Sequence, residues 1–553
     1  MQSPRRPVPF PHALNLFARH PRLAMANAAI AVGAAAACGF QPLSLWPLTL
    51  LAIACLLELV ARCVTGRGAL LVGWCFGLGH FTLGNNWIAT AFTYQANMPA
   101  WLGGIAVVLL SLYLAVYPAL ATLAAWLLIR PDRARAGNAR PRRFLALVLA
   151  FAAAWIVTEW MRAWVFTGFA WNPLGVALLG RFDARGLALV TPWIGTYGLS
   201  GLLVLLAGLP GTCLRAGMRR WLWAVPVLVI AAALSALMVL PDPWARREEG
   251  AIRFTLIQPD LRQEIVDDPR YYEANFIKMA RLSLPRAAGE KRVVFWPESG
   301  LGDYLRDGYP DYFYQMYTYA GDPVIARERI GRVIGAYGLL LTGGVDLVIK
   351  NDEEIAARNS VTAIDGGGDI LAGYSKAHLV PYGEYLPLRW LLEPLGASRL
   401  VAGALDFWPG PGPRSYDFGT WGKAGIQICY EIVFSGEVVD PMNRPDYIYN
   451  PSNDGWFGAW GPPQHLAQAR LRAIEEGLPI VRSTTTGISA VVDADGIVRA
   501  ALARHTAGRI DGRIPPPHEP TAFARYGNAL PLAFAALLLL GAFSMVALGR
   551  RHR

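Results

Sequence analysis

Long apolar runs fill most of the first 241 residues of the chain, and one more follows near its C-terminal end. A helix that crosses a bilayer needs about 20 mostly apolar residues, because each residue adds about 1.5 Å of length. The runs therefore predict about eight transmembrane helices, at residues 22–40, 42–61, 69–91, 101–129, 144–164, 188–213, 221–241 and 527–549. This pattern divides the chain into an N-terminal transmembrane domain of seven helices at 1–241 and a C-terminal helix with a basic tail at 527–553.

Residues 242–526 have a different pattern, in which short β-rich runs end abruptly at Gly, Pro or polar residues and alternate with helical stretches. One such stretch, QHLAQARLRAIEEG, places Leu466, Ala469 and Ile474 on one face of a helix. Alternating strands and helices bury their apolar sides best in layers. This part of the chain is therefore predicted to form a globular α/β sandwich.

The composition is that of a membrane protein, since 54% of the 553 residues are hydrophobic and the mean hydropathy is +0.31. The net charge of +11 could suggest nucleic-acid binding, but most arginines gather in alternate connecting segments that would share one side of a membrane. These are Arg5, Arg6, Arg19, Arg22, Arg62, Arg67, Arg130, Arg133, Arg135, Arg140, Arg142, Arg143, Arg215, Arg219, Arg220, Arg550, Arg551 and Arg553. The positive-inside rule assigns this side to the cytoplasm. Residues 242–526 then lie outside, in the periplasm of a bacterium, and no nucleic-acid partner is expected.

Cysteine usage singles out one residue of the α/β part. Five of the six cysteines lie within or at the ends of predicted spans, and Cys429 alone lies in 242–526. It has no partner for a disulfide there, and no Cys/His spacing typical of a zinc site is present. The sequence therefore predicts neither a metal nor another cofactor. A lone buried thiol is usually inert, so the neighbours of Cys429 decide its role.

Three β-rich runs each deliver one reactive side chain at or near their ends: Glu298, Lys376 and Cys429. A thiol near its free pKa is a weak nucleophile, and a partly buried carboxylate can take its proton. A lysine ammonium can stabilise the thiolate and then the oxyanion of a tetrahedral intermediate. The three residues together indicate acyl transfer through a thioester. A Cys–His pair with His378 or His465 is the rival arrangement, although neither histidine follows a strand end as cleanly.

Longer motifs occur in both parts of the chain. The apolar part contains GFQPLSLWPLTLLA, GLGHFTLGNNWIA, EWMRAWVFTGFAWNPLG and TPWIGTYGLSGLLVLL. The α/β part contains FWPES, GYSKAHLVPYGEYLP, GIQICYE, NPSNDGWFG, GPPQHLAQARLRAIEEGLPIVR and TTTGISAVVD, and FARYGNALPL leads into the last span. The α/β motifs resemble the nitrilase superfamily. Together with the spans, over nearly the whole chain, the set resembles the apolipoprotein N-acyltransferase family.

The resemblance implies a nitrilase-like αββα sandwich that is held in the periplasm by helices of the inner membrane. The family's Glu-Lys-Cys triad falls on Glu298, Lys376 and Cys429, with Glu298 as the base and Cys429 as the nucleophile. Three further positions would shape the site or hold the lysine: Glu384, Tyr430 and Glu431.

The implied reaction is ping-pong. The cysteine takes an acyl chain from a membrane phospholipid, and the thioester then acylates the amine of an S-diacylglyceryl-cysteine at the N-terminus of an apolipoprotein. This is the last step of bacterial lipoprotein maturation. The partners would be the bilayer, the phospholipid donor and the apolipoprotein acceptor, and the enzyme would act as a monomer without a cofactor.

Three other functions stay open at this point. One is a membrane-tethered nitrilase-like amidase that passes its acyl group to water, and another is a protein of the same architecture that serves a different export or conjugation system. The third is a transporter that uses the intramembrane charges of Glu58, Glu159 and Arg162. Two departures from the family leave substrate preference open. The sequence QEIVDD lacks a Trp that some members carry there, and Thr485 replaces the usual Asn.

Two aromatic stretches, 304–319 and 388–408, are predicted to form a mobile, membrane-facing rim over the site. Large apolar and aromatic side chains suit the bilayer interface, and a loop that admits two lipid substrates in turn must open. For the first stretch, packing in the core is the alternative.

Overall fold

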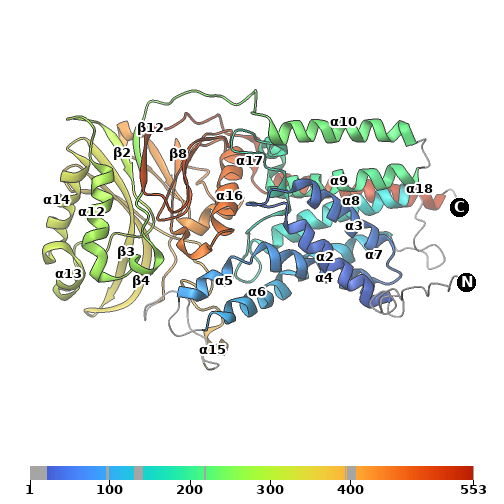
Figure 1. The fold of residues 1–553 in the computed structure, drawn as a ribbon, viewed down its shortest axis with the longest axis horizontal. Helices are drawn as coiled ribbons and strands as arrows, with labels where there is room; N and C mark the ends of the chain where they lie inside the picture. Colours follow the sequence, from blue (N-terminus) through green and yellow to red (C-terminus); the bar gives the residue numbers. More distant parts are fainter. Residues whose placement is uncertain are drawn as a thin grey trace, which may run out of the picture.

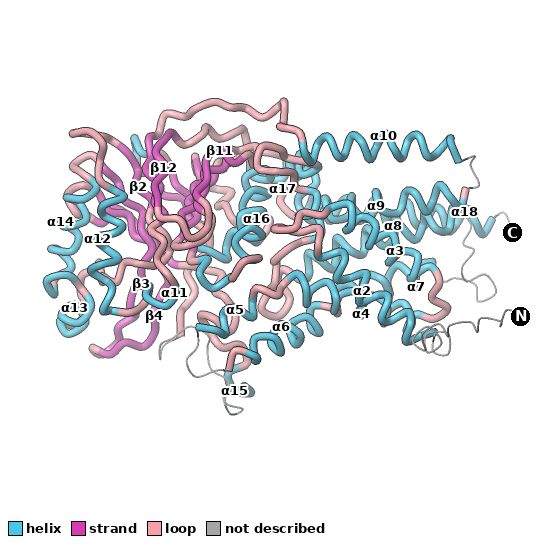
Figure 2. Tube along the Cα trace, viewed as in Figure 1, coloured by secondary structure: helices cyan, strands magenta, loops and turns pink. Residues whose placement is uncertain are grey.

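The computed structural model describes residues 21–94, 99–129, 141–216, 220–392, 394 and 406–551. Figure 1 shows two parts, a bundle of long helices and an α/β domain that sits on one end of the bundle. Figure 2 shows that the strands are confined to the α/β domain. The helical bundle and the α/β domain are therefore two distinct parts of the fold.

The helical bundle contains the long helices on either side of the α/β domain in sequence. These are α2 (Pro21–Ala37), α3 (Trp46–Ala61), α4 (Gly66–Gly84), α6 (Trp101–Leu114), α7 (Val116–Ile129), α8 (Pro141–Arg162), α9 (Thr191–Arg215), α10 (Arg220–Val239) and α18 (Ala529–Arg551). Glycines allow a close crossing between α2 and α4, because a Cβ on Gly33 would lie 1.9 Å from the carbonyl oxygen of Phe76. Small residues at crossings are typical of helices packed in a membrane.

Four segments of the described chain are long and apolar enough to cross a bilayer, which makes the bundle a membrane domain: Trp101–Ile129, Pro141–Arg162, Leu187–Arg215 and Ala529–Ala547. Three shorter apolar helices are Arg22–Ala37, Trp46–Ala61 and Ala224–Val239. The expected number of eight spans is therefore not confirmed. One reason is that residues 38–45 form turns instead of helix, which shortens the first two runs.

The α/β domain is built from two six-stranded sheets, ordered β12-β1-β2-β3-β4-β5 and β11-β10-β9-β8-β7-β6. The strands are β1 (Arg253–Gln258), β2 (Arg292–Phe295), β3 (Gly338–Lys350), β4 (Glu353–Asp365), β5 (Ile370–Ser375), β6 (Ser415–Asp417), β7 (Lys423–Ile426), β8 (Tyr447–Ser452), β9 (Ile480–Thr484), β10 (Ser489–Val492), β11 (Val498–Leu502) and β12 (Gly508–Arg513). The centre of each sheet is parallel, β1–β2–β3 in one and β7–β8–β9 in the other. Aromatic side chains fill the space between the sheets, where Phe295 contacts Tyr447 and Tyr449.

Helices cover the outer face of each sheet, and this completes the expected layered sandwich. The first sheet is covered by α12 (Tyr272–Ser283) and α14 (Pro323–Ile334), with α13 (Asp311–Tyr317) beside them. The second sheet is covered by α16 (Gly461–Glu476), which lies between that sheet and the membrane domain (Figure 1). The prediction of a two-sheet α/β sandwich is confirmed.

Helix α16 joins the two parts of the molecule. All of its residues except Pro463 are buried, including the polar ones. Gln464 accepts a hydrogen bond of 2.8 Å from the indole of Trp171, and Gln468 accepts one of 3.1 Å from the backbone N–H of Asn172. The apolar face expected from Leu466, Ala469 and Ile474 is therefore only half of its contact surface, because its polar face is buried against the membrane domain.

The expected membrane-facing rim is wrong for its first stretch. Residues 304–319 include α13, which lies on the side of the α/β domain away from the membrane domain (Figure 1). There Tyr309 and Tyr317 both pack edge-on against the ring of Tyr304. In the second stretch, α15 (Arg389–Leu392) lies at the level where the two domains meet, and residues 393 and 395–405 are outside the described residues.

Candidate active site

The structure buries Glu298, Lys376 and Cys429 between the two sheets, close enough for the charges of Glu298 and Lys376 to act on the thiol. Lys376 follows β5 directly, whereas Glu298 and Cys429 each lie three residues beyond a strand, β2 and β7. The amine Nζ of Lys376 lies 3.4 Å from Oε1 of Glu298. The first sheet therefore supplies the carboxylate and the amine, and the second supplies the thiol.

Cys429 has a strained backbone, with φ of +50° at a residue that is not glycine. Such a conformation costs about 1–3 kcal/mol and persists only where the surroundings enforce it. Two contacts do so here. Glu431 accepts a hydrogen bond of 2.7 Å from the N–H of Ile428, and His465 donates Nε2–H to the carbonyl of Cys429 at 3.0 Å. The turn that presents the thiol is therefore fixed from both sides.

The carboxylate of Glu431 also fixes the turn that follows Lys376. It accepts hydrogen bonds from the hydroxyl of Tyr374 and the N–H of Ala377, both at 2.7 Å, and a longer one of 3.3 Å from the N–H of His378. The sequence predicts that this residue holds the lysine. In the structure it acts on the backbone next to Lys376, and other residues hold the amine.

Tyr430 points toward the membrane domain. Its hydroxyl lies 3.5 Å from the carbonyl oxygen of Gly168, in the loop after α8, and its ring packs edge-on against Phe434. The side chain is buried. Tyr430 therefore forms part of the wall between the thiol and the membrane domain, at the place where the resemblance puts a wall residue.

Glu384 holds the amine of Lys376, and a residue that sequence reasoning missed holds both carboxylates. Oε1 of Glu384 lies 3.0 Å from Nζ of Lys376. The amide Nδ2 of Asn359 donates to Oε1 of Glu298 at 2.8 Å and to Oε1 of Glu384 at 2.9 Å. Asn359 stands in the middle of β4, and its carbonyl accepts the N–H of Lys376 at 2.8 Å. The role of Asn359 becomes apparent only from the pairing of β4 with β5, which places it beside Lys376.

The second carboxylate oxygen of Glu298 is held by the backbone of Asn453, whose N–H donates to Oε2 at 2.6 Å. The side chain of Asn453 is itself held, because its Oδ1 accepts the hydroxyl of Thr485 at 2.8 Å and its Nδ2 donates to Gln263 at 2.9 Å. Thr485 replaces the family's usual Asn, and Gln263 begins the stretch QEIVDD that lacks the Trp of some members. In this chain they orient the loop that anchors the carboxylate.

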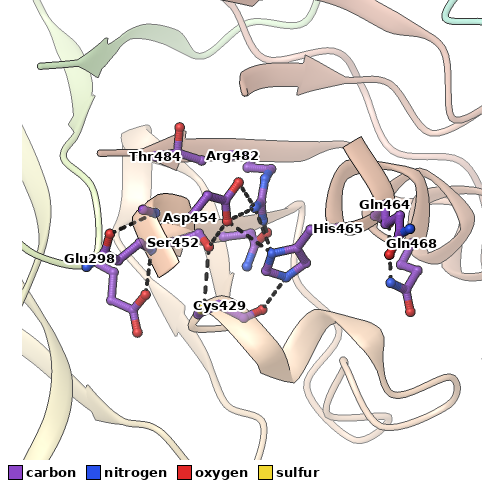
Figure 3. A network of polar contacts seen from close by, with 12 residues as sticks. Glu298, Cys429, Ser452, Asp454, Gln464, His465, Gln468, Arg482 and Thr484 are labelled. Atoms are coloured by element: carbon purple, nitrogen blue, oxygen red, sulfur yellow. Dashed lines mark hydrogen bonds and ion pairs between the residues drawn. The ribbon is translucent and has the colours of Figure 1, made fainter. Parts of the chain in front are cut away.

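A buried polar network lies on the other side of the thiol (Figure 3). The hydroxyl of Ser452 is 3.3 Å from Sγ of Cys429 and 2.7 Å from Oδ1 of Asp454. Arg482 donates to that carboxylate at 2.7 Å and to Nδ1 of His465 at 3.0 Å. Although burial raises the pKa of Asp454, the charge of Arg482 outweighs it, and the pKa lies below its usual range. Asp454 is therefore an ionised anchor.

The Cys–His alternative is not supported by this geometry. His465 bonds the carbonyl of Cys429 instead of its thiol, and burial together with Arg482 lowers the pKa of His465, so the ring is neutral. His378 pairs with Glu437 at 3.1 Å and stacks on Phe434 at 4.2 Å. Neither ring has a hydrogen bond to Sγ in the described part of the chain.

Comparison with known proteins agrees with the motifs. Residues 32–209 match the family described as "Apolipoprotein N-acyltransferase N-terminal domain", and residues 268–517 match "Carbon-nitrogen hydrolase". The "Apolipoprotein N-acyltransferase" of Rhodopseudomonas palustris is 33% identical over 93% of both chains, and that of Bradyrhizobium diazoefficiens is 34% identical over 93% of both. The chain belongs to the apolipoprotein N-acyltransferase family. The similarly named protein of Nitrosomonas europaea is 30% identical over 95% of this chain and 98% of its own.

An amidase from Nesterenkonia sp. is a more distant solved structure, at 17% identity and a TM-score of 0.33 over 51% of this chain and 95% of the amidase. The family assignment rests on the family matches and the relatives of similar length. The expectation from the sequence motifs is thus confirmed at the level of the family.

The electrostatics of the site favour a neutral thiol in the resting enzyme. Burial raises the pKa of Cys429 well above its ordinary value, and the charge of Glu298 raises it further, against the opposing effect of Lys376. Burial alone would lower the pKa of Lys376, but Glu384 and Glu298 outweigh it and the pKa is raised. The thiol must therefore lose its proton as it attacks. Among the described residues no group of three His, Cys, Asp or Glu side chains is arranged to hold a metal.

Proposed function

We propose that this chain moves a fatty acyl chain from a membrane phospholipid, through a thioester on Cys429, to the N-terminal amine of an S-diacylglyceryl-cysteine on an apolipoprotein. The observation that carries the proposal is the meeting of Glu298, Lys376 and Cys429 at one buried site, beside the membrane domain, in a chain related to the family over nearly its whole length.

The first half-reaction forms the thioester. Sγ of Cys429 adds to the ester carbonyl of the phospholipid while its proton passes to the carboxylate of Glu298. The ammonium of Lys376 stabilises the resulting oxyanion, and its two carboxylate partners keep it charged and aimed. The C–O bond then breaks, and the lysophospholipid alkoxide leaves with the proton from Glu298. Asn359 and Asn453 keep the base in place through both proton transfers.

The second half-reaction uses the same groups in the reverse order. The neutral amine of the acceptor attacks the thioester carbonyl, Lys376 again stabilises the oxyanion, and Glu298 takes a proton from the attacking nitrogen. Collapse expels the thiolate of Cys429, which recovers a proton from Glu298, and an amide remains on the acceptor. The two steps balance without a cofactor.

The position of the site supports donors and acceptors that are anchored in a bilayer. Exposed aromatic side chains stand at the ends of helices nearest the α/β domain: Trp101, Trp164, Trp193, Trp244 and Tyr526. Trp and Tyr are enriched at the membrane–water interface. The interface then lies where the two domains meet, and both substrates are concentrated at the level of the thiol.

The loop that carries Glu384 reaches the membrane domain as well. Tyr382 of this loop interacts electrostatically with Tyr113 of α6, and burial together with this interaction raises the pKa of Tyr382. The loop that holds Lys376 is thus also the part of the site that meets the bilayer.

The topology that suits this reaction is the one predicted from the arginines. The α/β domain at 242–526 lies in the periplasm, the seven helices of 1–241 and the helix of 527–553 span the inner membrane, and the basic tail is cytoplasmic. Glu384, Tyr430 and Glu431 shape the site around the triad. The enzyme acts as a monomer.

An assay of product type tests this proposal. Purified full-length protein receives a phospholipid with a labelled acyl chain and a synthetic S-diacylglyceryl-cysteine peptide. We expect labelled N-acyl peptide and lysophospholipid in equal amounts, and neither with Cys429→Ala. Release of labelled free fatty acid in place of the amide would make the protein a hydrolase and would refute the proposal.

A further inference from the structure

Two charged side chains near the C-terminal end of α16 form an ion pair inside the molecule. Nε of Arg472 lies 2.7 Å from Oε2 of Glu475, and both side chains are almost completely buried. Removing two charges from water is costly, and apolar residues of similar size usually serve stability as well or better. The role of the pair therefore lies in the groups that it binds and positions.

On one side the pair holds the start of a membrane helix. Gly195 has φ of +65°, which breaks the first turn of α9, so the regular helix starts at Thr196 and its N–H lacks a helical acceptor. Oε1 of Glu475 accepts that N–H at 2.5 Å, and Arg472 donates to the hydroxyl of Thr196. A carboxylate at a helix N-terminus is also favoured by the helix dipole. A side chain of the α/β domain thus caps a membrane helix.

On the other side the same pair holds the segment that follows the nucleophile. Arg472 donates to the carbonyl of Val433 at 3.0 Å, and Ser435 donates its hydroxyl to Oε1 of Glu475 at 2.9 Å. Val433 is the last residue of the short 3-10 helix that begins with Cys429. Two side chains therefore connect α9 to the turn that carries the thiol.

A second arginine of α16 provides a comparison. Arg470 is equally buried and also binds the membrane domain, because it donates to the carbonyls of Gly180, Arg181 and Ala184. It also donates to the carbonyl of Gly496, in the turn between β10 and β11, toward the opposite edge of the second sheet from β7 and the thiol segment. Arg470 thus docks the domains, whereas Arg472 and Glu475 dock them and also hold the nucleophile turn.

We propose that Arg472 and Glu475 are positioning residues that set the place of the Cys429 thiol relative to the end of α9, and thereby to an acyl donor held in the bilayer. This inference rests on the proposed function. A thiol displaced by about 1 Å from the reach of an anchored donor would lose up to about 100-fold in rate. A small soluble ester can follow the thiol, so it would not share that loss.

The test compares two donors on the full-length protein in phospholipid nanodiscs. Acylation of Cys429 by the nanodisc lipid is followed by intact mass, and acylation by p-nitrophenyl acetate is followed by nitrophenolate release. For Glu475→Gln and Arg472→Gln we expect lipid acylation to fall about 10- to 100-fold, with ester acylation within about twofold of wild type. Arg470→Gln, the matched control, should leave the ratio of the two rates unchanged.

A milder variant keeps the test decisive if the buried charge variants do not fold. Ser435→Ala removes only the link between Glu475 and the nucleophile segment, and we expect a loss of about threefold with lipid and none with the ester. Equal loss with both donors, no loss with either, or the same change of ratio in Arg470→Gln would overturn the inference. Absence of lipid acylation in the wild type would instead refute the proposed function.

Discussion

Helices α14 and α16 cover equivalent faces of the sandwich, yet their surroundings differ completely. In α14 the buried residues Ala326, Ile330 and Ile334 form one stripe, and the opposite side faces water. In α16 every residue but Pro463 is buried, because the membrane domain covers the side that α14 exposes. Polar residues of α14 such as Glu328 and Arg332 therefore face solvent, whereas polar residues of α16 such as Gln464 and Gln468 contact the membrane domain.

Two ion pairs of similar length illustrate the different exposure of the two layers. Arg329 of α14 lies 2.6 Å from Glu273, whose side chain is 57% exposed. Arg482, on the sheet under α16, lies 2.7 Å from Asp454, and both side chains are fully buried. Water screens the first pair and solvates either partner when the other is lost, whereas the second pair has no such substitute. Charges in the inner layer should therefore matter far more.

The largest expected contrast is in stability. Arg482→Met leaves Asp454 buried without its cation, and we expect the free energy of unfolding to fall by about 3–5 kcal/mol. Arg329→Met should cost about 1 kcal/mol or less. Denaturant unfolding of the purified full-length protein measures both. Because Arg482 depresses the folded-state pKa of Asp454, the stability that this carboxylate gives the wild type should be lost as the pH falls below about 4. Equal losses for the two variants would remove the contrast.

The next contrast is in catalysis. Glu384→Gln removes one of the two charges that hold the amine of Lys376, and a hydrogen bond to a charged group is worth about 1.5–3 kcal/mol. We expect the rate of Cys429 acylation to fall about 10- to 150-fold, with the fold intact. Glu273→Gln in the outer layer is the control and should react like wild type. An unchanged rate for Glu384→Gln would show that Glu298 alone aims the lysine.

A smaller contrast concerns the bilayer. Trp390 in α15 is 76% exposed at the level where the domains meet, and Leu391 is exposed beside it. Replacing both residues with serine removes apolar area that would contact the bilayer interface. The lost contact weakens binding by about 1 kcal/mol, so we expect lipid acylation from vesicles to fall roughly fivefold. The matched pair Tyr312→Ser and Met316→Ser changes exposed residues of α13, away from the membrane, and should have no effect. If the α13 pair slowed lipid acylation and the α15 pair did not, α13 would belong to the membrane-facing rim and α15 would not.

The smallest contrast is a single hydroxyl. Thr485→Val removes the hydrogen bond that orients Asn453, at a cost of about 0.5–1 kcal/mol, so we expect acylation to slow about two- to fivefold. In the outer layer, Thr318→Val also removes one buried hydrogen bond, to the N–H of Tyr304, and should not change the rate. A full rate for Thr485→Val would mean that Gln263 suffices to hold Asn453.

The sequence predicts what depends on local pattern. Glu298, Lys376 and Cys429 each follow a β-rich run that ends abruptly, and in the structure those strand ends converge. Asn359 could not be predicted, because it lies within a strand and its role depends on the pairing of β4 with β5. The same limit applies to α16. Its apolar face is readable from spacing, but the burial of its polar face depends on contacts nearly 300 residues away in sequence.

The position of the aromatic stretch 304–319 could not be predicted from its composition. Its composition suits a membrane interface as well as packing in the core. Only the position of α13, on the side of the α/β domain away from the membrane domain, decides between the two. The number of membrane spans could not be predicted from composition either. Hydropathy locates the apolar runs, whereas the turns at residues 38–45 decide how long the helices are.

The central claim is that Cys429 carries the acyl chain. The most direct measurement is the intact mass of the full-length protein after incubation with phospholipid in the absence of acceptor. We predict an added mass of one acyl chain on Cys429, removed by neutral hydroxylamine, transferred to a diacylglyceryl peptide when this is supplied, and absent in Cys429→Ala. Formation of N-acyl peptide by Cys429→Ala, or an acyl group that stays on another residue, would contradict the account.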